Sequence, residues 1–272
     1  MTIFKDYLLA WFGSVSMKNT NYLVECCILK EYVDLSFTKE EVIDSLIHIR
    51  TKITDQKDIE DIIDLLNNEF INVGVMFNYT KDTQNYNYLY KEAGILKNEF
   101  DPERNLIILT ITDIFLNNLL NKNDDILATS IIASCTHEDT HEQQYKLSQG
   151  KVKGTQNTPI NTNQQLKDYL KNTTEIDAHA RETAAFLYNK GISAKQIINM
   201  IKTNSKELIN LTAYRKYWDT FGIMSIYKGT LDDDGKERLK VWKRFLKRII
   251  AYLLTTTKYK YNDSDFEKIL PK

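Results

Sequence analysis

The sequence predicts an α+β fold in which helices predominate around a small sheet. Apolar residues recur at helical spacing along most of the chain, whereas only two short segments, 71–79 and 105–112, are apolar and rich in β-branched residues. With three Pro and nine Gly among 272 residues, the chain also has few turn residues for a sandwich or barrel with many tight turns. These observations favour a small sheet with flanking helices.

The first part of the chain is expected to be helical. Thr38 is followed three residues later by Glu41, which is the spacing of a capping box at a helix N-terminus. Segment 55–70 carries Ile and Leu at positions that share one helix face. We therefore interpret residues 1–70 as an N-terminal helical region and residues 71–272 as a second region, with one single domain as the alternative.

The remainder of the chain is expected to contain helices and one long loop. A helix is predicted from Asp124 to Leu147, with acidic residues in its first turn. Gly, Thr, Asn and Gln dominate residues 148–165, which we interpret as a loop. Further helices are predicted over residues 173–191, 193–204, 205–221 and 232–257.

The charge balance argues against a protein with a strongly basic surface. Lys and Arg number 36 and Asp and Glu number 37, for a formal charge of -1, so we expect no nucleic-acid partner. No apolar run approaches the length of a membrane-spanning helix, so we expect no membrane association. The three cysteines have no metal-binding spacing and are typical of reduced thiols.

One motif points to chemistry, the pattern H-E-x-x-H at residues 137–141. His137 and His141 are one helical turn apart and project from the same face, so both imidazoles can bind one zinc ion. Glu138 lies one position further round the helix, where its carboxylate can accept a proton from water but cannot easily reach the metal. The pattern predicts a zinc site with Glu138 as the general base.

A catalytic zinc site needs a third protein ligand, and the next predicted helix offers candidates. Glu175 lies in the first turn of that helix, and His179 follows four residues later on the same face. Cys135 is less suitable, because it precedes His137 by two residues and points away from the metal-binding face.

This arrangement resembles the zinc peptidases that use two His and one Glu as ligands. The segments "HEDTHEQQ" and "EIDAHA" are also similar to segments in a group of phage-encoded zincin-like metallopeptidases, as are, less closely, residues 4–8 and 241–253. The resemblance implies a gluzincin-like catalytic domain over residues 71–272. The implied zinc ligands are His137, His141 and Glu175.

The resemblance leaves two further residues to place. Asp177 is a competing ligand, because a related peptidase pattern places its ligand directly before an Ala. Asp177 lies about 200° around the helix from Glu175, so the two cannot both face the metal. His179 stands where these peptidases often carry an Asp that supports a ligand. We expect His179 to act in the site, by orienting a ligand, by stabilising the oxyanion or by replacing Glu175.

The resemblance implies a zinc-dependent peptidase that acts on a peptide or protein in the cytoplasm of a host cell or in a virion. The alternative is a non-catalytic phage structural or binding protein with a virion or host protein as partner. A third hypothesis is hydrolysis of another amide, such as a cell-wall cross-link.

Four accessory features are also predicted. Strand 105–112 could be the sheet edge that holds a substrate or, equally, a plain core strand, and the loop over residues 148–165 could cover the cleft. An oxyanion could accept a hydrogen bond from Tyr214, Tyr217 or Tyr227. The closing helix is amphipathic, and we interpret its basic outer face as solvated. That face comprises Lys240, Lys243, Arg244, Lys247 and Arg248.

Overall fold

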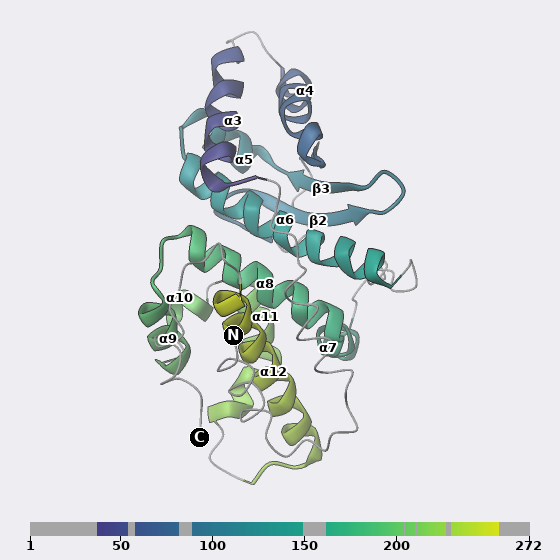
Figure 1. The fold of residues 1–272 in the computed structure, drawn as a ribbon, viewed down its shortest axis with the longest axis vertical. Helices are drawn as coiled ribbons and strands as arrows, with labels where there is room; N and C mark the ends of the chain where they lie inside the picture. The colour runs from purple at the N-terminus through teal and green to yellow at the C-terminus, as the bar shows by residue number, and fades with distance from the viewer. Residues whose placement is uncertain are drawn as a thin grey trace.

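The fold is α+β, mostly helical, with one small mixed sheet (Figure 1). A computed structural model of the chain describes residues 37–53, 58–81, 89–148, 162–203, 205–209, 211–226 and 230–255. The helical interpretation of residues 1–36 and the candidate Tyr227 lie outside these described residues. Within the described ranges, no helix combines the length and the apolar character that crossing a bilayer requires.

The two predicted N-terminal helices are confirmed as α3 (Lys39–Lys52) and α4 (Ile59–Phe70). The capping box of α3 is formed, since Thr38 Oγ1 accepts from the backbone N–H of Glu41 and the Glu41 carboxylate accepts from that of Thr38. Each helix buries one apolar stripe, and α4 packs on the first strand of the sheet.

The sheet has the order β1-β3-β2, with β1 (Val75–Tyr79) parallel and β2 (Ile95–Asp101) antiparallel to β3 (Leu106–Ile111). The predicted strands correspond to β1 and β3. Strand β2 was missed, because its second half contains Asn, Glu and Asp, which are depleted in strands. A turn follows β2 after Asp101 and includes Asn105 at a φ of 54°.

The helix α5 (Asp113–Leu120) leads into α6 (Asp124–Leu147), whose bounds match the prediction. Figure 1 shows α6 running along the sheet and lying between it and α8. Because α6 is covered on both sides, most of its first eighteen residues are buried. This position places the 137–141 motif in the interior of the protein.

The second half of the chain is helical, with bounds that differ from the prediction at two places. The predicted loop over residues 148–165 ends earlier, because a capping box of Thr162 and Gln165 begins a helix at Asn163. The single helix predicted over residues 205–221 is two helices. The elements are α7 (Asn163–Lys171), α8 (Thr173–Asn189), α9 (Ala194–Thr203), α10 (Lys206–Ile209), α11 (Thr212–Thr220), η2 (Gly222–Ile226) and α12 (Asp233–Thr255).

Two hydrophobic clusters hold the fold together. The first joins α3, α4, the sheet, α5 and the first half of α6, and the second joins α7 to α12. The helix α8 lies between them, since Phe186 belongs to the first cluster and Leu187 to the second. The α6–α8 interface is therefore the junction of the two clusters, and the motif lies in it.

The amphipathic prediction for α12 is confirmed, with one correction. Its apolar residues pack in the second cluster, whereas Lys240 and Lys243 are exposed. Arg248, which the sequence predicts on the solvated face, is instead buried at 7% exposure. Its guanidinium Nε lies 2.8 Å from Asp177 Oδ1 on α8, and this opposite charge compensates its burial.

Candidate metal centre

The candidate site lies where α6 and α8 pack side by side. His137, Glu138 and His141 come from α6, and Glu175 and His179 come from α8. All five side chains are buried, although titratable groups are mostly exposed in proteins unless they are paired. Such a concentration of buried polar groups between two helices requires mutual partners or a bound ion.

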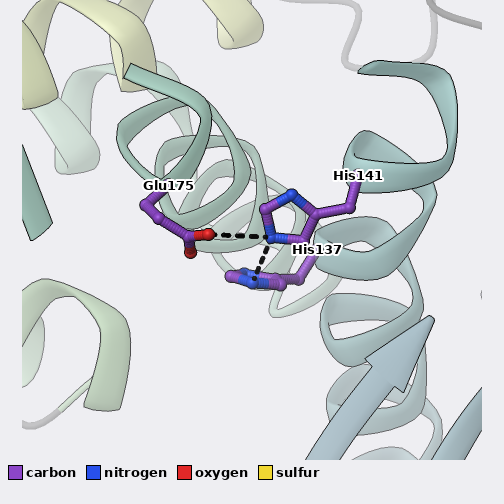
Figure 2. A group of neighbouring side chains, drawn as sticks. All are labelled: His137, His141 and Glu175. Atoms are coloured by element: carbon purple, nitrogen blue, oxygen red, sulfur yellow. Dashed lines mark hydrogen bonds and ion pairs between the residues drawn. The ribbon is translucent and has the colours of Figure 1, made fainter. Parts of the chain in front are cut away.

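Three of these residues converge on one point (Figure 2). His137 Nε2 lies 3.2 Å from His141 Nε2, and His141 Nε2 lies 3.5 Å from Glu175 Oε1. The three ligand atoms all lie within 4.8 Å of one another, close enough to bind a single ion. Two imidazole nitrogens and one carboxylate oxygen form a donor set that suits zinc.

The two competing ligands have other partners. Asp177 faces α12 and pairs with Arg248, so it is outside the group of converging atoms. His179 lies beside His137, with 4.4 Å between the ring centroids, but it is also outside the group formed by His137, His141 and Glu175. Of the three candidates, Glu175 is the one that meets both motif histidines.

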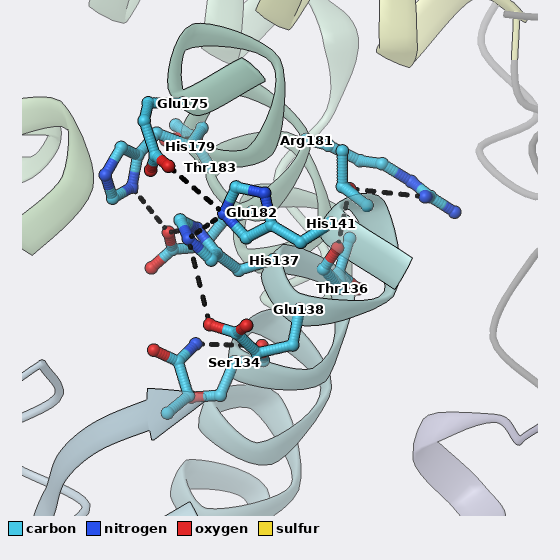
Figure 3. A network of polar contacts seen from close by, with 12 residues as sticks. Ser134, Thr136, His137, Glu138, His141, Glu175, His179, Arg181, Glu182 and Thr183 are labelled. Atoms are coloured by element: carbon cyan, nitrogen blue, oxygen red, sulfur yellow. Dashed lines mark hydrogen bonds and ion pairs between the residues drawn. The ribbon is translucent and has the colours of Figure 1, made fainter. Parts of the chain in front are cut away.

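A carboxylate outside the predicted set of site residues contacts both His137 and His179 (Figure 3). Glu182 Oε2 lies 2.9 Å from His137 Nδ1 and 3.0 Å from His179 Nδ1, and Glu182 Oε1 accepts a hydrogen bond of 2.7 Å from the Tyr90 hydroxyl. Glu182 follows Glu175 by seven residues, which is two helical turns on the same face. That spacing is the one signal in the sequence that could have identified it.

The other motif histidine also has an outer partner. His141 Nδ1 lies 3.1 Å from Gln144 Oε1, and Gln144 Nε2 donates to the backbone carbonyl of Thr174 at 3.2 Å. Glu182 and Gln144 therefore both connect a histidine of α6 to α8. Partners of this kind fix the ring orientation of metal-binding histidines.

Glu138 lies at the edge of the group, close to the sheet. Its Oε1 is 3.9 Å from His137 Nε2, and a hydrogen bond from the backbone of Phe100 on β2 also reaches its carboxylate. Burial raises the pKa of Glu138 to about 7, because the low-dielectric interior disfavours the charged form. A carboxylate with this pKa can accept a proton near neutral pH.

The charges of the converging residues complement one another. Burial alone would lower the pKa of His141, but hydrogen bonding and attraction to Glu175 raise it to about 9. Burial would raise the pKa of Glu175, but the same contact with His141 holds it well below its usual range. Burial lowers the pKa of His137 to about 4, so this ring is neutral at physiological pH.

Two tyrosines lie near the site on its α8 side. Tyr169 of α7 donates a hydrogen bond to Glu175, and burial together with this carboxylate raises the pKa of Tyr169 well above 10. Tyr217 of α11 packs edge-on against His179 at 5.7 Å between ring centroids, and its buried hydroxyl has no hydrogen-bond partner among the described residues. Tyr214, another predicted candidate, packs instead against Trp242 and Phe245.

The edge of the sheet near the site is not the segment 105–112 but strand β2. Strand β3 pairs with β1 on one side and β2 on the other, so residues 105–112 form an inner strand of the sheet, which was the second of the two alternatives, and not its edge. The edge beside α6 is β2, where Asn98 Nδ2 donates to the backbone carbonyl of Ser134 at 3.0 Å.

Comparison with protein-family models, with curated proteins and with solved structures found no match to this chain.

Proposed function

We propose that the protein is a zinc-dependent metallopeptidase of the zincin type, with His137, His141 and Glu175 as the zinc ligands. The observation that carries this proposal is the convergence of these three ligand atoms within 4.8 Å in the protein interior. Glu175 comes from a separate helix, so the spacing of the motif alone does not account for its position. The donor set matches the two-His-one-Glu type of catalytic zinc site.

Glu138 is assigned the role of general base. Its carboxylate lies beside His137 without belonging to the three-ligand group, and its raised pKa suits proton transfer near neutral pH. Zinc bound in this site would polarise a substrate carbonyl and make a water molecule more acidic. Glu138 would accept the proton of that water and then deliver it to the leaving amine.

The edge of β2 is assigned to the substrate. Among the described residues, β3 pairs with one side of β2, Leu89 and Tyr90 pair with Ile95 and Leu96 at its start, and β2 passes Glu138 further on, at Phe100. A peptide in extended conformation can add to such an edge through backbone hydrogen bonds, which favours a peptide or protein substrate. The family resemblance supports a phage protein that acts in the host cytoplasm or in the virion.

The burial of the site favours one alternative function. His137, Glu138, His141, Glu175 and His179 are each 7% exposed or less, which also suits a metal that stabilises a fold. In that case the protein is a phage structural or binding protein that holds zinc without hydrolysing a peptide. The two functions share the metal site and differ only in turnover.

Metal analysis tests the proposal first. Purified wild-type protein should contain one zinc per chain, and His141→Ala should contain none, although its circular dichroism spectrum is unchanged. Absence of zinc from wild type after incubation with zinc and removal of the excess would reject the metal site. Hydrolysis of denatured casein by the zinc-loaded protein then separates the peptidase from the structural alternative.

A further inference from the structure

Glu182 is at the centre of a buried network that joins both clusters of the fold. Its side chain is 0% exposed, and its two oxygens accept three hydrogen bonds, from Tyr90, His137 and His179. Three donors satisfy the buried carboxylate, so it can remain ionised in the interior. The Tyr90 ring also stacks on Phe186 at 5.6 Å, which fixes the position of the donor hydroxyl.

The contacts of Glu182 determine the tautomers of two histidines. An ionised carboxylate has only acceptor sites, so each imidazole that contacts Glu182 Oε2 through Nδ1 must carry its proton there. A neutral ring with a proton on Nδ1 has a lone pair on Nε2. In their neutral forms, His137 and His179 therefore both present an Nε2 lone pair on the side of the ring away from Glu182.

We propose that Glu182 is a positioning residue that holds His137 and His179 in the same Nδ1–H tautomer, with His137 directed to the metal and His179 directed away from it. The inference rests on the proposed metal site, because His137 acts as a ligand only if a metal binds there. The inference also assigns a role to His179, for which the sequence allows three: orienting a ligand, stabilising the oxyanion or replacing Glu175.

In this arrangement His179 is a hydrogen-bond acceptor. Its Nε2 is buried, has no hydrogen-bond partner among the described residues and lies outside the three-ligand group. The neighbouring Tyr217 hydroxyl is likewise buried without such a partner. A neutral His179 can accept an N–H or O–H group from a ligand or a water there, but it cannot donate a hydrogen bond to an oxyanion.

Nuclear magnetic resonance of the full chain tests the tautomers directly. The chain has four histidines, so ¹⁵N-histidine labelling gives four ring systems, which single substitutions can assign. In metal-free protein, His137 and His179 should both show the Nδ1–H tautomer, whereas the half-exposed His48 serves as a reference for a solvated ring. An Nε2–H tautomer at either His137 or His179 would overturn the proposal.

Addition of zinc to the same sample tests the direction of each ring. The Nε2 resonances of His137 and His141 should shift on coordination, and that of His179 should remain unshifted. A coordination shift at His179 would make it a metal ligand and overturn its assignment as an acceptor. If no histidine responds to zinc, the proposed function fails, whereas the tautomers of the metal-free protein still decide the role of Glu182.

Two variants distinguish a role of Glu182 in positioning the histidines from a role in the stability of the fold. Glu182→Met replaces the carboxylate with an apolar side chain of similar length and should weaken zinc binding by about 10- to 100-fold, because an outer partner of a ligand is lost. Tyr90→Phe is the matched control, since it removes a hydrogen bond to the same carboxylate and leaves both imidazole contacts. We expect a much smaller change in zinc affinity for Tyr90→Phe.

The decisive test measures both the zinc affinity and the tautomers of His137 and His179 in the Glu182 variants. Glu182→Met should lose the uniform Nδ1–H state of His137 and His179 as well as zinc affinity. If Glu182→Met is unfolded, Glu182→Leu provides the same comparison with a shorter apolar side chain, which likewise cannot accept a hydrogen bond from either Nδ1–H group. Wild-type zinc affinity together with unchanged tautomers in a folded Glu182 variant would show that Glu182 does not position the histidines.

Discussion

Glu175 Oε1 lies 3.5 Å from His141 Nε2, although the two residues belong to different helices, α8 and α6. Both side chains are buried, so their opposite charges interact with little screening by solvent. This contact joins the sequence motif to its candidate third ligand.

Zinc affinity should depend on pH through His141. Because the pKa of His141 is about 9 in the metal-free protein, zinc must displace a proton from this ring at lower pH. Affinity should therefore rise about tenfold for each pH unit between 7 and 9 and level off above 9. Titration with a competing chelator at several pH values measures this slope, and an affinity independent of pH would contradict the assignment.

The stability of the metal-free protein should change in the opposite direction over the same range. The folded-state pKa of His141 is raised from 6.5 to about 9, so the stability from its pairing with Glu175 is fully present below pH 6.5. That contribution is lost as the pH rises through 9. Urea unfolding of metal-free wild type and Glu175→Gln at pH 7 and 9.5 checks it, because the difference between the two proteins should shrink at the higher pH.

Two carboxylates of α8 should respond differently to neutralisation. Glu175→Gln removes a charged ligand and should reduce zinc affinity by more than about 100-fold, since loss of an outer partner alone costs about 10- to 100-fold. Asp177→Asn is the control, because Asp177 faces Arg248 instead of the converging ligand atoms. Zinc binding by folded samples of both variants decides between the two assignments, and loss of zinc only in Asp177→Asn would reverse them.

Neutralising Glu138 should separate binding from turnover. Glu138→Gln should keep stoichiometric zinc and lose about 100- to 10,000-fold in casein hydrolysis, because the amide cannot accept the proton. Glu142→Gln on the same helix is the control, since this carboxylate pairs with Lys146. Retention of full activity by Glu138→Gln would remove Glu138 from the mechanism.

The ion pair of Asp177 and Arg248 should contribute to stability rather than to metal binding. Removing one partner leaves a buried charge uncompensated, so Arg248→Met should lower the free energy of unfolding by about 3–5 kcal/mol. The double variant Asp177→Leu with Arg248→Met should cost less than the sum of the single variants. Urea unfolding of the four proteins measures the coupling, and additive effects would argue against a direct interaction.

Local patterns predicted much of the fold and part of the site. The bounds of α6, the capping box of α3 and strands β1 and β3 follow from periodicity and capping residues, which act over a few neighbouring positions. Strand β2 could not be recognised in the same way, because its polar residues are stabilised by pairing with β3 and by contact with α6. Its place in the sheet depends on distant segments.

The sequence by itself determined that two imidazoles lie on one helix face with the Glu138 carboxylate one position further round, because a helix repeats every 3.6 residues whatever surrounds it. It also placed Glu175, Asp177 and His179 on the next helix, without deciding among them. The packing of α8 against α6 and α12 distinguishes Glu175 from Asp177, because Glu175 contacts His141 on α6 and Asp177 contacts Arg248 on α12. Tertiary structure alone brought Glu182 to His137, because a contact between two helices depends on how their faces meet.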